Sequence, residues 1–154
     1  MEEQKPLGAD LRAIRESYSI TVQGMADVGG ISFLTQRVWE TMPPEKQKEF
    51  DPKDPETYER ETALLKKLWD ERQQAISIVL GRAEMQAKKR GGNPESVTVH
   101  LPYYRSQKEY DAAASDGKPA AIANADSRAV GDAARYAGYC VKYHYPDDGV
   151  ETWI

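Results

Sequence analysis

The sequence predicts a mainly α-helical protein with a small α+β part at its C-terminus, and three patterns support this fold class. Apolar residues recur at three- and four-residue steps in three short segments within Leu11–Glu40. The stretch Glu56–Arg90 contains no proline and is rich in residues that favour helix. Over Val97–Tyr103, apolar and other side chains alternate, which is typical of a strand.

Two short helices are expected first. The first spans Leu11–Tyr18, and Asp10 precedes it as the expected N-cap. The second spans about Thr21–Val28, and the Thr21 hydroxyl is placed to cap its first turn. Gly29–Gly30 ends this second helix, because glycine adopts a positive φ without a Cβ clash.

A third short helix is expected over Phe33–Glu40, with Ser32 as its N-cap. The prolines of Pro43–Pro44 cannot continue it, so it stops near the preceding residues. The turn-rich segment Asp51–Pro55 marks a boundary. Asp54 is placed to cap the helix that follows, with proline in its first turn.

The central stretch Glu56–Arg90 is expected to form one helix, roughly 50 Å long at 1.5 Å per residue. This is long for a chain of 154 residues, so the helix either kinks or packs against a partner chain. The basic cluster Lys88–Arg90 suits a helix C-terminus better than it suits a second nucleic-acid contact. Gly91–Pro94 ends the helix.

The last third of the chain mixes helix and strand signals. A helix capped by Ser106 is expected over Gln107–Ala114, and a short strand over Ala120–Ala123. Asp126 is expected to cap a further helix with an alanine-rich face. The segment Tyr139–Tyr145 also alternates, so the end of that helix can be a strand instead.

Composition and charge limit the possible functions. The net charge is −4, which argues against a basic, nonspecific nucleic-acid coat. An acidic protein still binds specific DNA if its cations share one face. Cys140 is the single cysteine, so neither an internal disulfide nor a CxxC metal site is possible. The chain has no long apolar run and begins with a polar segment, so we expect a soluble cytoplasmic protein without a membrane partner.

Signals for catalysis are weak. His100 and His144 are the only histidines, and neither belongs to a metal-binding pattern. Cys140 lies four residues before His144, but a nucleophile site needs a third, orienting group. No glycine-rich phosphate-binding motif occurs. The sequence therefore predicts no enzyme, no catalytic residue, no cofactor and no metal.

The second and third helices, joined by a tight glycine turn, predict a helix-turn-helix that lays its second helix in the DNA major groove. The candidate DNA-contacting residues are Arg15, Gln23, Ser32, Phe33, Thr35, Gln36 and Arg37. Gln36 can pair with adenine and Arg37 with guanine. Gln23 and Arg15 are placed for phosphates. Phe33 either packs under the second helix or touches a thymine methyl group.

This stretch resembles the DNA-binding half of the Cro/C1-type (XRE-like) repressor family, which has a lambda-repressor-like helical bundle. The matching segments are Leu11–Glu16, Ala26, Gly30–Ser32 and Trp39–Glu40, at the family's spacing. One departure is Gln36, where the family usually has a branched apolar residue. Either the third helix is rolled so that Val38 packs instead, or Gln36 faces DNA.

The second half, through Leu101–Ser106, Glu109–Tyr110 and an alanine-rich helix that ends in tyrosines, resembles the C-terminal domain of certain two-domain helix-turn-helix proteins. That group includes an anti-CRISPR-associated autorepressor. The resemblance implies a homodimer, held through its C-terminal part, on an inverted-repeat operator. The expected organisation is a DNA-binding domain over 1–50, a connector and long helix over 51–92, and a dimerisation domain over 93–154.

The predicted function is therefore a transcriptional repressor that binds double-stranded DNA, with its own promoter as the expected target. A protein-interaction module, such as an antitoxin or phage-type adaptor, is the alternative. In that case the tyrosine-rich C-terminal part would be the working surface. Stacking of these tyrosines on single-stranded RNA is the less favoured use.

Overall fold

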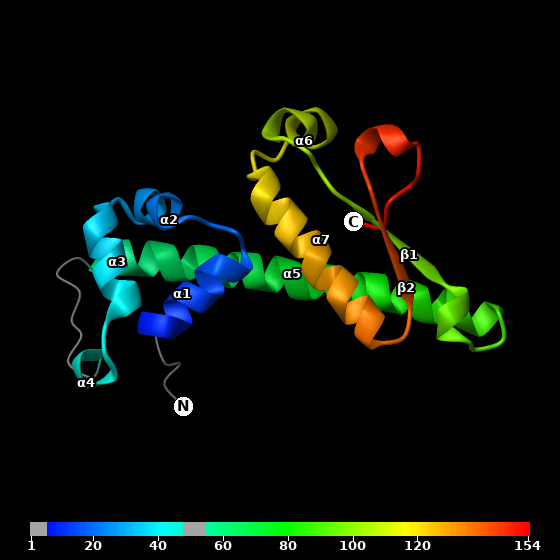
Figure 1. The fold of residues 1–154 in the computed structure, drawn as a ribbon, viewed down its shortest axis with the longest axis horizontal. Coiled ribbons are helices and arrows are strands. Elements are labelled where there is room, and N and C mark those ends of the chain that lie inside the picture. Colours follow the sequence, from blue (N-terminus) through cyan, green and yellow to red (C-terminus); the bar gives the residue numbers. More distant parts are fainter. Residues whose placement is uncertain (1–5, 48–54) are drawn as a thin grey trace. The chain divides into compact units, whose positions relative to one another are not determined.

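A computed structural model describes residues 6–47 and 55–154 of the protein (Figure 1). It is mainly helical, at 67%, with seven α-helices and one two-stranded parallel sheet in the described part. This confirms the predicted mainly α-helical fold with a small strand-containing part near the C-terminus. The chain divides into two compact units, Met1–Trp69 and Asp70–Ile154, and the division falls within helix α5 (Pro55–Lys89). The first unit thus extends past residue 50, where the sequence had placed the boundary.

The first unit contains four helices before α5. They are α1 (Gly8–Ser17), α2 (Val22–Gly29), α3 (Phe33–Thr41) and the single turn α4 (Pro44–Gln47). α3 packs against both α1 and α2. Three expected helices are thus confirmed to within three residues at each end. Asp10 is not the N-cap of α1, because the helix begins earlier and Leu7 holds that position. The expected cap Asp54 and the segment 51–54 lie outside the described residues.

The expected capping groups of α2 and α3 are confirmed. The Thr21 hydroxyl accepts a hydrogen bond from the Gly24 N–H at 2.9 Å. The Ser32 hydroxyl accepts one from the Thr35 N–H at 3.1 Å. Each satisfies a backbone donor that the first helical turn leaves unpaired. Gly30 ends α2 with φ +69°, a left-handed conformation that glycine adopts without strain.

The start of α5 completes the core of the first unit. Its buried apolar side chains are Leu7, Leu11, Tyr18, Met25, Ala26, Trp39, Tyr58, Leu65 and Leu68. The Trp39 and Tyr58 rings meet edge to face with centroids 5.6 Å apart. The Tyr58 hydroxyl donates to the Pro6 carbonyl at 2.9 Å. The first turns of α5 therefore contribute buried side chains to the core of the first unit.

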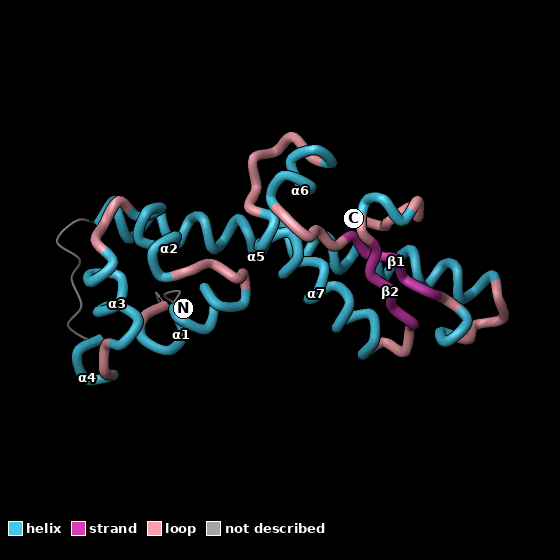
Figure 2. The backbone as a smooth tube through the Cα atoms, turned by 45° about the horizontal axis from the view of Figure 1, so that its top comes forward, coloured by secondary structure: helices cyan, strands magenta, loops and turns pink. Residues whose placement is uncertain are grey.

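The second unit packs a small sheet and two helices with the rest of α5. Its elements are β1 (Thr98–Pro102), α6 (Gln107–Ala113), α7 (Ala120–Tyr136) and β2 (Cys140–His144), with single 3-10 turns over Pro94–Ser96 and Pro146–Asp148. The strands are parallel and lie side by side (Figure 2), with Val99 opposite Val141. The crossover through α6 and α7 permits this direction. The buried core comprises Val79, Ala83, Ala87, Val97, Val99, Leu101, Val130 and Ala134.

Two expectations for the second unit are wrong. Ala120–Ala123 is the first turn of α7 and not a strand, since alanine is the strongest helix former and Gln107 Oε1 accepts from the Ala120 N–H at 2.7 Å. Asp126 is not a cap. It lies within α7, buried, where its Oδ1 accepts from Arg72 Nε at 2.8 Å. Of the two alternatives for Tyr139–Tyr145, the strand is correct, because Cys140–His144 forms β2. None of the helices in the described ranges has the length and apolar character needed to span a membrane.

Candidate nucleic-acid interface

The connection from α2 to α3 is short, and backbone hydrogen bonds hold it to the end of α2. The Ile31 N–H bonds the Ala26 carbonyl at 3.0 Å, so the chain reverses directly after Gly30. Arg60 of α5 donates from Nη2 to the Gly29 carbonyl at 3.1 Å, which satisfies the C-terminal end of α2. No local pattern in the sequence singles out Arg60, because only the packed structure brings it to this turn. The turn fixes the direction in which α3 leaves α2.

One face of α3 is exposed. The exposed residues Leu34, Arg37, Val38 and Thr41 occupy positions i, i+3, i+4 and i+7, so they share that face. The exposed fractions of Leu34 and Val38 are 71% and 59%. Apolar side chains are normally the ones that a helix buries, so this exposure marks the face as a candidate binding surface.

Four of the seven predicted DNA-contacting residues are exposed, and Thr35 is half-buried. Gln23 donates from Nε2 to Asp27 Oδ1 at 2.7 Å along the outside of α2. The hydroxyls of Ser32 and Thr35 lie 3.0 Å apart at the start of α3. Phe33 is 40% exposed, so its side chain is neither fully packed under α2 nor fully in solvent. Arg37 is exposed at mid-helix.

The remaining two residues, Gln36 and Arg15, are buried, so their expected placement toward DNA is wrong. Gln36 has no exposed surface, and its Nε2 donates to Glu40 Oε2 at 2.9 Å. Both alternatives for Gln36 fail, because Val38 does not pack in its place either. Arg15 is 6% exposed and donates from Nε to both carboxyl oxygens of Glu40, at 2.9 and 3.0 Å. The opposite charges are buried together, which keeps either from being buried uncompensated.

A second buried carboxyl adjoins this ion pair. Glu61 of α5 is 1% exposed, and a Cβ added at Gly29 would overlap its carboxyl group. Neither carboxyl oxygen accepts a hydrogen bond of normal geometry within the described part of the chain, although the Gln36 amide lies near enough to lower the Glu61 pKa in part. Burial, and then repulsion from Glu40, raise the pKa of Glu61 to about 7. Nothing in the local sequence around Glu61 distinguishes it from the exposed glutamates of α5.

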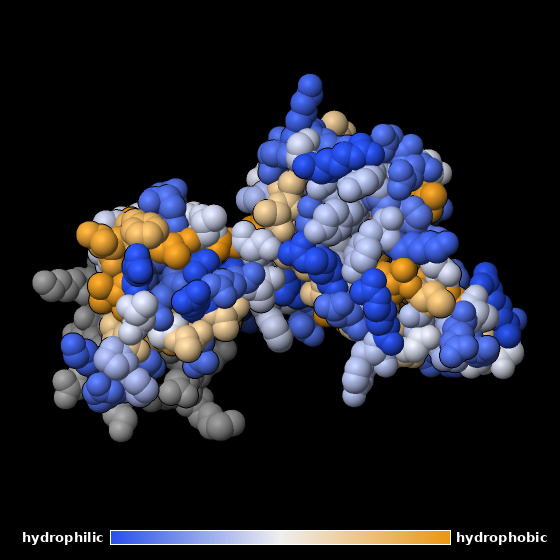
Figure 3. Space-filling view, viewed as in Figure 1, coloured by the Kyte–Doolittle hydropathy of each residue, from blue (hydrophilic) through white to orange (hydrophobic). Residues whose placement is uncertain are grey.

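Exposed apolar side chains gather over α2 and α3 (Figure 3). We call Val28, Phe33, Leu34 and Val38 the apolar patch; their exposed fractions run from 39% to 71%. Arg37 is the only charged residue on the exposed face of α3. The surface is therefore more apolar and less basic than the sequence analysis expected.

These groups suit recognition of base edges. A guanidinium pairs with guanine, and aliphatic side chains contact the thymine methyl group. The described residues contain no group of three or more histidine, cysteine or acidic side chains that could hold a metal ion. Neither a protein-family model nor a curated protein matches this chain.

Proposed function

We propose that the first unit binds double-stranded DNA sequence-specifically, with α2 and α3 acting as a helix-turn-helix. The observation that carries this proposal is the two-sided character of α3. Its inner face is fixed by the buried contacts of Arg15, Gln36 and Glu40, and its outer face is exposed. A major groove about 12 Å wide admits one such helix.

The exposed residues of α2 and α3 are the contacts that we propose. Arg37 is the residue for a bidentate bond to guanine, and Leu34 and Val38 are placed for thymine methyl groups. Ser32 and Gln23, near the starts of α3 and α2, are placed for phosphates. This set replaces Gln36 and Arg15, which support α3 from beneath.

We also propose that the protein acts as a homodimeric repressor on an inverted repeat. A nine-residue helix is about 13.5 Å long at 1.5 Å per residue, which spans roughly four base pairs. So short a site recurs by chance throughout a genome. Two copies related by a two-fold axis, with recognition helices about 34 Å apart, double the sequence that is read.

The expected result of an Arg37→Ala substitution is a loss of specific binding of about 1–3 kcal/mol, because a base contact disappears while the fold is kept. The duplex is first selected from a random DNA pool with the wild-type protein, and affinities are then measured by gel-shift titration. Lys89→Ala is the matched control, because it removes an exposed cation from α5 in the second unit. Its affinity is expected to match the wild type.

A second candidate function is protein binding through the apolar patch, and the exposure of Leu34 and Val38 favours it. The same selection from a random DNA pool distinguishes DNA binding from protein binding. If no sequence is enriched from the pool, or if Lys89→Ala weakens binding as much as Arg37→Ala, specific DNA recognition by α3 is contradicted. The exposure of the apolar patch would then favour the second candidate function.

A further inference from the structure

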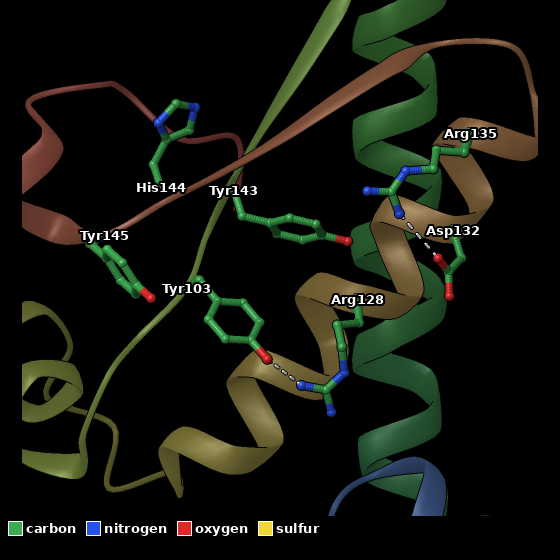
Figure 4. Close-up of a pocket in the computed structure, with 7 residues that line it drawn as sticks. All are labelled: Tyr103, Arg128, Asp132, Arg135, Tyr143, His144 and Tyr145. Atoms are coloured by element: carbon green, nitrogen blue, oxygen red, sulfur yellow. Dashed lines mark hydrogen bonds and ion pairs between the residues drawn. The ribbon is translucent and has the colours of Figure 1, made fainter.

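A pocket of about 470 Å³ lies in the second unit, between α7 and the strand edge (Figure 4). This volume is within the range typical of sites for small molecules. Its lining includes Tyr103, Tyr143 and Tyr145 from the strand side, and Arg128, Asp132 and Arg135 from α7. The pocket is separate from the DNA-binding surface proposed above, because all of these residues belong to the second unit.

The strand side of the pocket is aromatic. Tyr143 of β2 and Tyr145, which directly follows the strand, both line the pocket, as does His144 between them (Figure 4). The rings of Tyr103 and Tyr143 meet edge to face with centroids 5.7 Å apart. Gly131 of α7 lets Tyr143 come close, since a Cβ there would overlap the tyrosine hydroxyl. These rings make one side of the pocket aromatic, and the Arg105 guanidinium carbon lies over the Tyr145 ring, 3.9 Å from its centre.

The helix side of the pocket is cationic. Arg128 and Arg135 are seven residues apart, two turns of α7, so both project from one face. Arg128 donates from Nη1 to the Tyr103 hydroxyl at 2.6 Å. The Arg135 guanidinium carbon lies 5.5 Å from the centre of the Tyr143 ring. Two guanidiniums therefore face one carboxylate, Asp132, in a chain whose net charge is −4.

The existing ion pair in the pocket is easily exchanged. Arg135 Nη1 lies 3.3 Å from Asp132 Oδ1, and their side chains are 50% and 78% exposed. Exposed pairs of this kind contribute little to stability. A phosphate, which accepts paired hydrogen bonds from a guanidinium, is the stronger partner for Arg135.

From this arrangement we infer that the pocket binds a nucleotide, with the base against the tyrosine rings and the phosphate on Arg128 and Arg135. A simple anion would leave the aromatic side unused, and an apolar ligand would make no use of the guanidinium groups of Arg128 and Arg135. A nucleotide uses both sides, because every base has a face that stacks on an aromatic ring. The rings do not select one base.

The test is isothermal titration calorimetry on the full chain with AMP, GMP, CMP and UMP, the corresponding nucleosides, and inorganic phosphate. At least one monophosphate is expected to bind at least tenfold more tightly than its nucleoside and than phosphate alone. The absence of binding by every monophosphate at millimolar concentration overturns the inference. Equal binding by phosphate alone also overturns it, because the aromatic side then contributes nothing.

Variants locate the site. Arg128→Gln and Arg135→Gln are each expected to weaken the monophosphate at least tenfold, and Tyr143→Leu to weaken it while sparing phosphate. Lys142→Gln is the matched control, because Lys142 is an exposed cation of β2 outside the pocket lining, and it is expected to stay within twofold. Circular dichroism melting identifies any variant that fails to fold, and Arg135, which is half-exposed, is the one expected to tolerate substitution.

Two further outcomes contradict the inference. An equal loss with Lys142→Gln would show general charge attraction rather than a site. A single-stranded tetranucleotide that binds at least tenfold more tightly than any monophosphate would assign the pocket to a nucleic-acid strand. Neither outcome tests the proposed role of Arg37. Arg37 belongs to the first unit, and its DNA binding is measured with duplex DNA.

Discussion

Replacement of Arg15 by alanine is expected to destabilise the first unit by about 3–5 kcal/mol, which is the cost of leaving one partner of a buried ion pair alone. Glu40 is 5% exposed, and its two carboxyl oxygens accept hydrogen bonds from Arg15 Nε. Without Arg15, this carboxylate stays buried close to a second carboxyl, that of Glu61. Arg15 also donates to the Ile20 carbonyl, which then loses its bond at the start of the turn into α2.

The measurement is urea unfolding followed by the fluorescence of Trp39 alone, in a Trp69→Phe, Trp153→Phe background. Trp39 is buried in the first unit, so its signal reports that unit even if the second unfolds separately. Arg12→Ala is the control, since Arg12 lies one turn earlier on α1 with an exposed partner, Glu16. No measurable loss of stability is expected for it.

A double variant separates charge from packing. Arg15→Ala combined with Glu40→Gln is expected to be more stable than Arg15→Ala alone, because no carboxylate then remains buried at residue 40. If Arg15→Ala is no more damaging than Arg12→Ala, the pair does not hold α1 to α3. The support beneath the proposed recognition helix would then have to come from apolar packing alone.

The free energy of unfolding of the first unit is expected to fall by about 3 kcal/mol as the pH rises from roughly 4.5 to 7, because of Glu61. Burial, followed by repulsion from Glu40, raises the pKa of Glu61 from 4.5 to about 7, and the nearby Gln36 amide opposes this only in part. The folded unit therefore keeps the proton that the unfolded chain releases above pH 4.5. Each pKa unit of difference corresponds to 1.36 kcal/mol.

Glu61→Gln tests this directly. The amide cannot ionise, so the variant is expected to match the wild type near pH 4 and to exceed its stability by about 3 kcal/mol at pH 8. Glu59→Gln is the control, since Glu59 is an exposed residue of the same helix. Urea unfolding at several pH values, in the background that keeps only Trp39, measures the free energy of unfolding of each variant and of the wild type. Parallel pH profiles for Glu61→Gln and the wild type would contradict the assignment.

Local signals in the sequence were sufficient to predict where most of the helices lie. Thr21 and Ser32 cap the helices that they precede, and Gly30 ends α2, because each acts on backbone groups within three residues. The proline-free stretch after Pro55 forms α5 for the same local reason. At Ala120–Ala123 the sequence predicted a strand, whereas this segment is the first turn of α7. There the bond from Gln107, thirteen residues away, helps to begin the helix.

The candidate sites depended on contacts that no local pattern contains. The pocket joins Tyr103, which follows β1, to Arg128 on α7, so only the crossover of the second unit brings them together. Likewise, Arg60 reaches the end of α2 from α5, a helix that begins only at Pro55.

The sequence by itself determined where most of the helices lie and which residues cap α2 and α3. Only the tertiary structure decided which polar side chains face inward, as Gln36 and Arg15 do. The physical reason is that burial of a polar group depends on its partner. Glu40 lies 25 residues from Arg15 and accepts hydrogen bonds from both side chains, so the pair could be buried only once α1 and α3 had packed.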